Sequence, residues 1–269
     1  MLNKNLSKIL FVSFFLTLIL LSASANMAHA IEVTATIPVG TKPQGVAYDS
    51  CKGAIFVTNY GSNTVSVISD RTDTVVATVQ VGVEPVGVAY DSGKGEVFVA
   101  NGGSNTVSVI SDNTNTVVAT IPMGSNSADQ PHPLCIAFDS ATSEIYVVNS
   151  YPYTSAPGQV SVISDSNNTI LTSISVGDNT YYAAYDSAKG EIFVTNYGDD
   201  FVSVISDSTN AVVANVTLPA QGAYASAGIS YDSAKGEIFV VNQAGNVFIL
   251  SDSVNAFVET VTLGRFPVV

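Results

Sequence analysis

The chain has 269 residues and a formal net charge of −13 at neutral pH. Charged residues make up only 12% of it, and β-branched and small polar residues dominate, a composition typical of an all-β globular protein and not of a disordered tail. A chain this acidic should repel nucleic acid and anionic lipid, which argues against both as partners.

The first thirty residues have the layout of a secretory signal peptide. Lys4 and Lys8 precede the apolar run Ile9–Leu21, and small residues ending at Ala28–Ala30 follow. These three features match the basic start, the apolar centre and the cleavage site of a signal peptide. An uncleaved anchor would need about 20 apolar residues to cross a bilayer. We therefore expect a secreted or cell-surface protein, with a signal peptide at 1–30 and a mature chain 31–269 that has no transmembrane segment. Loss of two of the nine basic residues would leave the mature chain at −15.

After residue 30 the sequence repeats with a period in the low forties. Copies of "VVATVQVG" begin at Val33, Val75 and Val117, each 42 residues apart, and three more follow at spacings of 53, 42 and 45 residues. Five copies of the cassette "GVAYDS…GEIFVTNYG…VSVISD" lie between them, and the decapeptide "YDSAKGEIFV" occurs twice. A fixed period of this length indicates a repeat architecture. The cassettes are about 31–74, 75–116, 117–169, 170–211 and 212–256, with a partial copy at 257–269.

Each period contains four short predicted strands. Asp and Gly in "YDSAKGE" supply the turn chemistry of a four-residue hairpin, and Asp and Asn in "SDNTNT" do the same for the next turn. Four antiparallel strands per period are typical of a β-propeller blade whose first strand is innermost. We therefore predict an all-β propeller. In the first copy the strands are Gly45–Asp49, Ala54–Asn59, Thr64–Asp70 and Thr74–Gly82.

The second predicted strand carries a motif that resembles a known family. It reads "FVTN" at Phe56–Asn59 and Phe193–Asn196, with variants starting at Phe98, Tyr146 and Phe239. The pattern is similar to that of the YVTN-family β-propeller repeat proteins, although the literal tetrapeptide does not occur. The resemblance implies a ring of about seven blades and a secreted or surface-layer protein.

The number of repeats departs from that expectation. The chain has five hairpin cassettes and six copies of the outer strand, and "GRFPVV" at its end lines up with "GVEPVG" at Gly82–Gly87. Three interpretations stay open: a five-bladed ring closed by the N-terminal outer strand, an open arc completed by another chain, or a piece of a longer protein. An open arc would expose a sheet face at each end, where copies could self-associate.

Length differences between the copies all fall in one set of loops. Because strand direction alternates, the second-to-third loops and the connections between blades share one face, and these are the loops that vary. Variable loops on a rigid scaffold are common binding surfaces, and tyrosine is a frequent recognition residue. The candidate ligand-binding residues on this face are His132, Tyr151, Tyr153, Tyr181, Tyr182, Asp199, Asp200 and Tyr224.

The catalytic inventory is small. His132 is the single histidine after residue 30, and its place between two prolines is more typical of a surface loop than of a catalytic triad. We assign no catalytic residue and no metal site, although oxygen ligands for Ca²⁺ could come from Asp129, Asp178, Asp199 and Asp200. The recurrent asparagines that end the second strands, such as Asn59, are interpreted as structural.

The two cysteines and two sequons give further expectations. Cys51 and Cys135 fall on opposite faces of non-adjacent blades, so no disulfide should join them, and Cys51 should be the more exposed thiol. The sequons at Asn167 and Asn215 are candidates for glycosylation.

These features favour a secreted or cell-surface propeller that acts as a non-enzymatic binding or surface-structural module, with a protein or glycan as partner. The alternative is a propeller hydrolase or lyase, lactonase-like, with its site at the mouth of the central channel. A lone histidine and the lack of a dispersed acid–base cluster count against the enzyme.

Overall fold

The computed structural model describes residues 33–124, 131–151, 157–219 and 226–263. The chain divides into two units, Met1–Thr36 and Ile37–Val269. Of the first unit, residues 33–36 are described, and they are exposed and have no regular secondary structure. The second unit is all-β, with 20 strands in five four-stranded sheets, which confirms the predicted fold class. Within the described ranges, no helix has the length and apolar character needed to cross a membrane.

Each sheet consists of four consecutive antiparallel strands. Sheet 1 contains β1 (Pro43–Asp49), β2 (Ala54–Asn59), β3 (Thr64–Ser69) and β4 (Thr74–Gln80); sheet 2 contains β5 (Pro85–Asp91), β6 (Glu96–Asn101), β7 (Thr106–Ser111) and β8 (Thr116–Pro122). Sheet 3 contains β9 (His132–Asp139), β10 (Glu144–Ser150), β11 (Gln159–Ser164) and β12 (Thr169–Ser175). Sheet 4 contains β13 (Thr180–Asp186), β14 (Glu191–Asn196), β15 (Phe201–Ser206) and β16 (Ala211–Thr217); sheet 5 contains β17 (Ser226–Asp232), β18 (Glu237–Asn242), β19 (Asn246–Ser251) and β20 (Ala256–Thr262).

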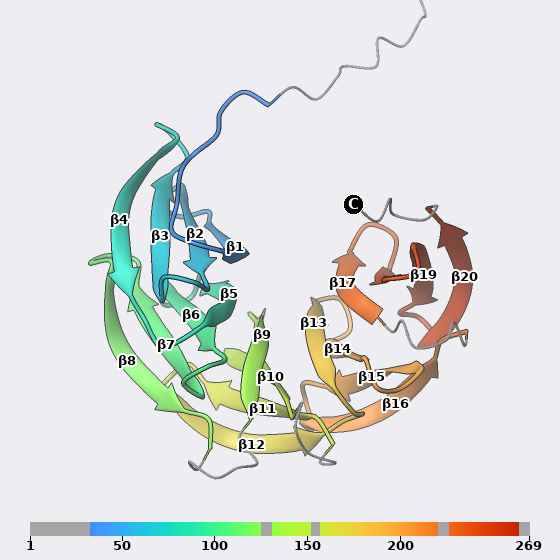
Figure 1. Ribbon diagram of the computed structural model, residues 1–269. Coiled ribbons are helices and arrows are strands. Elements are labelled where there is room, and N and C mark those ends of the chain that lie inside the picture. The colour runs from blue at the N-terminus through green and yellow to red at the C-terminus, as the bar shows by residue number, and fades with distance from the viewer. Residues whose placement is uncertain (1–32, 125–130, 152–156, 220–225, 264–269) are drawn as a thin grey trace, which may run out of the picture. The chain divides into compact units, whose positions relative to one another are not determined.

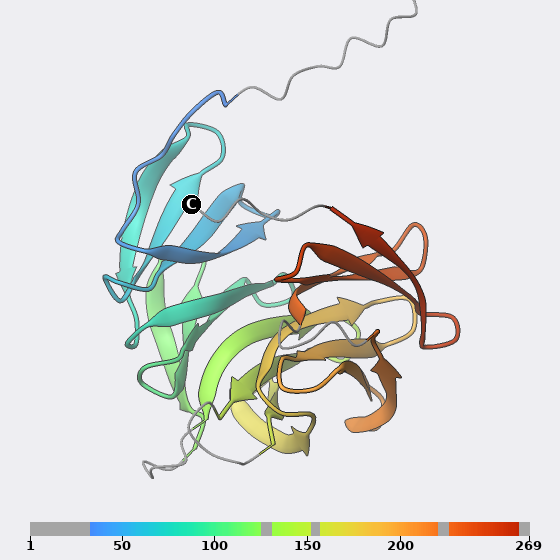
Figure 2. The same ribbon diagram turned by 45° about the vertical axis from the view of Figure 1, so that its right-hand side comes forward.

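The five sheets are arranged as an open arc. Figures 1 and 2 show the first strands, β1, β5, β9, β13 and β17, towards the axis and the fourth strands on the outside. The first strands contact one another in chain order, β1 with β5, β5 with β9, β9 with β13 and β13 with β17, and over the described ranges no similarly extensive contact joins β17 to β1. Sheets 1 and 5 therefore each have a neighbour on one side only.

One detail of the prediction is wrong. The N-terminal copy of the outer-strand sequence, from Val33 to Gly40, is not a strand. The physical reason is that none of the described sheets offers it a free edge to pair with, whereas the other five copies each pair with the third strand of their own sheet. Closure of a five-bladed ring by this segment is not seen among the described residues.

The hairpin turns form as the sequence predicts. Asp49 Oδ1 accepts hydrogen bonds from the backbone N–H groups of Cys51 at 2.8 Å and Lys52 at 3.1 Å, and Gly53 closes the turn with a φ of 65°. The same turn recurs in sheets 2, 4 and 5 with a glycine at this position, while in sheet 3 Ser143 adopts a φ of 60° in its place. Glycine suits the left-handed region because it has no Cβ.

Each sheet has two faces, which we call leading (on the side of the first strands' preceding neighbour in chain order) and trailing (on the opposite side), and in sheets 2, 3 and 4 both are buried against neighbouring sheets. Between sheets 1 and 2, Phe56, Val65, Val67 and Val79 of the trailing face pack against Val97, Val99 and Ile110 of the leading face of sheet 2. Three further clusters repeat this contact between the other neighbours. This packing explains why the second and third strands are almost continuously apolar, since both of their faces are covered.

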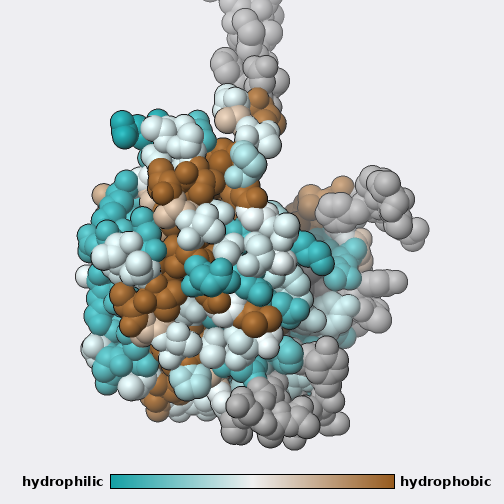
Figure 3. All heavy atoms as spheres, turned by 60° about the vertical axis from the view of Figure 1, so that its left-hand side comes forward, coloured by the Kyte–Doolittle hydropathy of each residue, from teal (hydrophilic) through white to brown (hydrophobic). Residues whose placement is uncertain are grey.

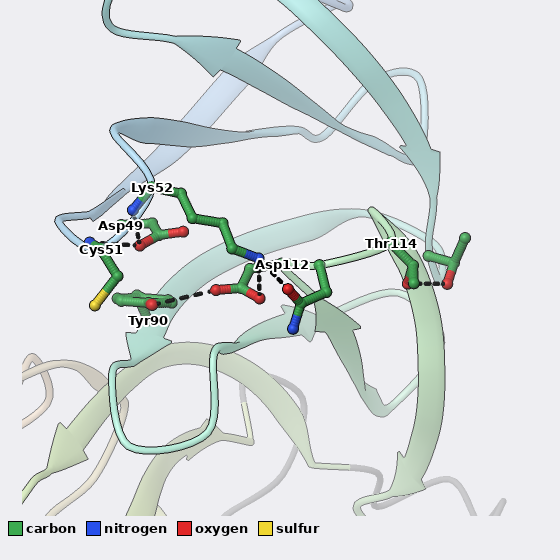
Figure 4. A network of polar contacts seen from close by, with 8 residues as sticks. Asp49, Cys51, Lys52, Tyr90, Asp112 and Thr114 are labelled. Carbon is green, nitrogen blue, oxygen red and sulfur yellow. Dashed lines mark hydrogen bonds and ion pairs between the residues drawn. The ribbon is translucent and has the colours of Figure 1, made fainter.

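A polar contact at the hairpin end joins neighbouring sheets beside this core. Lys52, in the first hairpin of sheet 1, donates to Asp112 Oδ1 at 2.7 Å and to Asn113 Oδ1 at 2.8 Å in sheet 2. Tyr90 donates to the other oxygen of the same carboxylate at 3.3 Å (Figure 4). At the same repeat position, Lys94 and Lys189 donate hydrogen bonds to the backbone carbonyls of Asp165 and Asp252, each in the next sheet. In sheet 3 the lysine position is occupied by Thr142.

The outer strands are more exposed than the rest of each sheet. Each presents an apolar residue to solvent, and Figure 3, which brings the side of β4 and β8 forward, shows apolar side chains interspersed with polar ones. These exposed residues are Val76, Val118, Leu171, Val213 and Val258.

Candidate functional site

In the described part of sheets 1, 2 and 4, the loops after the second strands and the connections between sheets lie on one face of the arc. Gly61 N donates to Thr41 O at 2.9 Å, so the loop after β2 is bonded to the segment that enters β1. The corresponding bonds join Gly103 to Val83 and Gly198 to Asp178, at 3.0 Å each. The structure therefore places the second-to-third loops and the connections between sheets together, as predicted from the alternation of strand direction.

The first strands approach one another closely on this face of the arc. Their ladders are irregular here, with a register shift between Pro43 and Val46 in β1 and between Pro85 and Val88 in β5. A Cβ on Gly45 would lie 2.4 Å from Val86 O, and a Cβ on Gly87 would lie 2.5 Å from Leu134 O. These two glycines are needed because the backbones of neighbouring first strands are almost in contact.

Beside these glycines lies a cavity of about 210 Å³, which we call the axial cavity. Four of the five sheets contribute to it, through their first strands or the loop that follows β2. Its walls combine two aliphatic side chains with an amide and three phenols, an arrangement suited to a small ligand that has both an apolar face and hydrogen-bonding groups. The lining residues are Gln44, Tyr60, Val86, Leu134, Tyr181 and Tyr182.

The aromatic side of the axial cavity is built from a cluster of tyrosines. The ring of Tyr181 lies 6.2 Å from that of Tyr182 and 5.5 Å from that of Tyr197, centroid to centroid. Tyr182 remains 41% exposed. Burial, together with Cys135 and Tyr181, raises the pKa of Tyr182, so its hydroxyl is protonated at neutral pH and can donate a hydrogen bond to a ligand.

The lining residues share a position in the repeat. Gln44, Val86, Leu134 and Tyr181 each lie five residues before the aspartate that ends the first strand. The residue at this position is an amide, a valine, a leucine or a tyrosine, and in all four sheets it lines the axial cavity.

Of the predicted ligand-binding residues, two line the axial cavity: Tyr181 and Tyr182. His132 begins β9 and is half-buried, and Tyr151 donates to Gln159 Oε1 at 3.1 Å. Asp199 Oδ2 accepts from Asp178 N at 2.7 Å, and Asp200 O accepts from Leu218 N at 2.7 Å. These four residues are not among the lining residues. Tyr153, Tyr224 and Asp129 lie outside the described residues.

Sequence reasoning missed Gln44, Tyr60, Val86 and Leu134. Gln44, Val86 and Leu134 end the connections between blades, directly before the predicted first strands, and they were passed over because the candidates were chosen for aromatic or charged character. Tyr60 follows the second strand of the first copy, whose loop has no insertion. The signal that could have found them is the variation at one repeat position.

The axial cavity offers little for acid–base chemistry. The side chains that line it include no histidine, carboxylate or lysine. Over the described residues, no group of three or more His, Cys, Asp or Glu side chains is placed to hold a metal ion. The described lining residues offer aromatic contact and neutral hydrogen-bonding groups.

The recurrent asparagines and the cysteines lie where the sequence predicts. Asn59 Nδ2 donates to Ser66 Oγ at 3.0 Å, and Asn101 repeats the bond to Ser108 at 2.9 Å, so these amides tie the second strand to the third. Cys51 and Cys135 are both free, and Cys51 is the exposed one.

The two sequon asparagines are exposed. Asn167 lies in the turn before β12, where its Oδ1 accepts a hydrogen bond from Thr169 Oγ1 at 2.7 Å, and Asn215 lies on β16. Their glycosylation stays a prediction.

Comparison with known proteins informs the fold. No protein-family model matches the chain, and no curated protein matches it. Among solved structures, the chain is similar to one titled Kuenenia stuttgartiensis hydrazine synthase, with a TM-score of 0.61 and 15% identity over 88% of this chain and 91% of that one. The fold is a β-propeller. At this identity the similarity concerns the fold alone, and the resemblance to the YVTN family stays a prediction.

Proposed function

We propose that this protein is a secreted or cell-surface β-propeller that acts as a non-enzymatic binding module and takes its ligand in the axial cavity. The signal-like first thirty residues and the acidic charge support a role outside the cell. The observation that carries the binding role is the convergence of one variable repeat position, from four sheets, on a single cavity.

The lining indicates the class of ligand. Phenol rings offer flat apolar contact, while Gln44 and the tyrosine hydroxyls offer neutral donors and acceptors. With no charged side chain among the lining residues, a neutral molecule fits better than an ion. A neutral glycan or a short neutral peptide segment at the cell surface has this chemistry.

Saturation-transfer NMR with a panel of neutral oligosaccharides and short neutral peptides tests the proposal. We expect at least one probe to bind, and binding to fall by about tenfold or more in Tyr181→Ala and in Gln44→Ala. Tyr48→Ala is the matched control, because Tyr48 is an exposed tyrosine of β1 that does not line the cavity. Binding that survives both cavity substitutions, or no binding by any probe, would contradict the site. Turnover of a bound probe, or of a lactone, would instead support the lactonase-like alternative.

A further inference from the structure

The four contacts between neighbouring sheets are four instances of one interface. In each, a leading face with two aliphatic residues on the second strand meets a trailing face with a large aromatic residue on the second strand. The trailing aromatics Phe56, Phe98, Tyr146 and Phe193 are all fully buried. Any leading face of this chain therefore has the general shape to cover any trailing face.

Sheet 1 presents a leading face that no sheet covers. Val46 is 69% exposed and Tyr48 54% exposed, whereas their counterparts in sheet 2, Val88 and Tyr90, are half-buried against sheet 1. The adjacent Ile55 and Val57 are also half-buried, while Val97 and Val99, at the same positions in sheet 2, are fully buried.

The trailing face of sheet 5 is likewise not covered by any of the described sheets. Phe239 is half-buried, although the residues at its position in the other four sheets are fully buried. Val241 is 39% exposed and Val261 41% exposed. Val216, which holds the position of Val261 in sheet 4, is only 4% exposed.

The charges at the two ends complement each other. Lys235 occupies the hairpin position of Lys52, and within the described part of the chain its ion pair is a 3.8 Å contact to Glu237 of the same sheet. Asp70 occupies the position of Asp112 and is exposed, whereas Asp112 is buried beneath Lys52. Tyr48 donates to Asp70 at 2.9 Å just as Tyr90 donates to Asp112. Asp70 in sheet 1 and Lys235 in sheet 5 thus correspond to Asp112 and Lys52, the acceptor and the donor of the contact in Figure 4.

We propose that copies of this chain associate head to tail, the leading face of sheet 1 of one copy covering the trailing face of sheet 5 of another, with Lys235 of the second reaching Asp70 of the first. This inference is independent of the proposed ligand site. Such a contact is heterologous, so after the first contact one copy retains a free trailing face and the other a free leading face.

Two residues make this junction weaker than the internal interfaces. Glu191 accepts a hydrogen bond from Asn255 at 3.0 Å between sheets 4 and 5, but at the junction Glu237 would meet Asp73, which holds the asparagine position in sheet 1. On β20, Glu259 replaces the alanine present at Ala77, Ala119 and Ala214. Like charges and an inward-pointing carboxylate both oppose association, so it should be reversible and depend on concentration.

Each chain already occupies a large part of a turn (Figure 1). A second copy joined in this way either opens the arc into a two-chain ring or rises along the axis as a spiral. A ring stops at a dimer and a spiral continues to grow with concentration. Both contain the same junction.

Sedimentation of the purified protein at low salt, from about 1 µM to about 1 mM, measures the association. We expect the mass to rise with concentration, and Lys235→Glu and Asp70→Lys each to raise the dissociation constant about tenfold or more. The double variant, with both substitutions in one chain, places a glutamate opposite a lysine at every junction and should recover the affinity. Lys42→Glu is the matched control for charge, because Glu84 already occupies the same repeat position in sheet 2.

Two further variants should strengthen the junction. Asp73→Asn and Glu259→Ala restore the residues of the internal interfaces, and each should lower the dissociation constant by about two- to fivefold. Both sites are exposed, so the variants should fold, which the melting curve at low concentration checks. A mass that stays monomeric throughout would overturn the proposal. So would an association that none of the end-face variants changes, because it would use another surface.

Discussion

At the scale of single residues, the same repeat position can carry opposite electrostatics in different sheets. Asp112 accepts from Lys52 of the preceding sheet, whereas Asp207 holds the same position in sheet 4 and the sheet before it has Thr142 at the lysine position. Burial, and then the charge of Asp139, raise the pKa of Asp207 above its ordinary value. An acid with a raised folded-state pKa holds its proton more tightly in the native state, so its contribution to stability falls as pH rises through that window.

Asp207→Asn should therefore raise the free energy of unfolding at pH 7 by up to about 1 kcal/mol, since Asp207 is partly solvent-screened. The gain should vanish below about pH 4, where the aspartate is protonated in both states. Asp112→Asn should have the opposite sign and cost about 1–3 kcal/mol at pH 7, because it removes a charged hydrogen-bond partner of Lys52. Urea denaturation at the two pH values measures both variants. If both variants raised, or both lowered, the free energy of unfolding at pH 7, the claim that the two aspartates have opposite electrostatic effects would be wrong.

At the scale of strands and sheets, stability depends on whether a sheet has one neighbour or two. Phe193 and Phe239 occupy the same position in the second strand of sheets 4 and 5, within the matching sequences "EIFVTN" and "EIFVVN". Phe193 is fully buried against sheet 5, and Phe239 is half-buried because no sheet of the described residues packs against its face.

Phe193→Ala should cost about 3–5 kcal/mol, as expected for removal of a fully buried aromatic side chain. Phe239→Ala should cost less than half of that, because much of its surface already meets water. Chemical denaturation at low protein concentration, where the copies are dissociated and the end faces are free, gives both values. Equal losses would mean that the trailing face of sheet 5 is covered within the monomer.

The strands and their turns were predictable from the sequence because similar strand and turn residues recur in five copies. Asp49 and Gly53 specify the hairpin at which β1 ends, and the structure forms it as expected. The N-terminal copy of the outer strand shows the limit: its sequence has the pattern of a strand, but a strand forms only where a sheet offers an edge to pair with.

The candidate site was less predictable than the fold. Tyr181 and Tyr182 were found from their aromatic character, but Gln44 and Val86, which directly precede the predicted first strands, are neither aromatic nor charged and were passed over. The register irregularity that turns their position towards the axial cavity is a property of the ladder, and no single copy of the motif reveals it.

At the scale of the whole molecule, the central claim is that the sheets form an arc with two ends and not a closed ring. In such an arc each sheet is stabilised by its immediate neighbours, as in other repeat arrays. The middle sheet packs against a neighbour on both faces, while sheets 1 and 5 each pack on one face only.

Native-state hydrogen–deuterium exchange of the monomer, read by mass spectrometry for each strand, tests this claim most directly. The account predicts the slowest exchange in β10 and β11 of sheet 3 and the fastest in the second and third strands of sheets 1 and 5, β2, β3, β18 and β19. Uniform protection of the second and third strands in all five sheets would contradict it, because only a closed ring lacks ends.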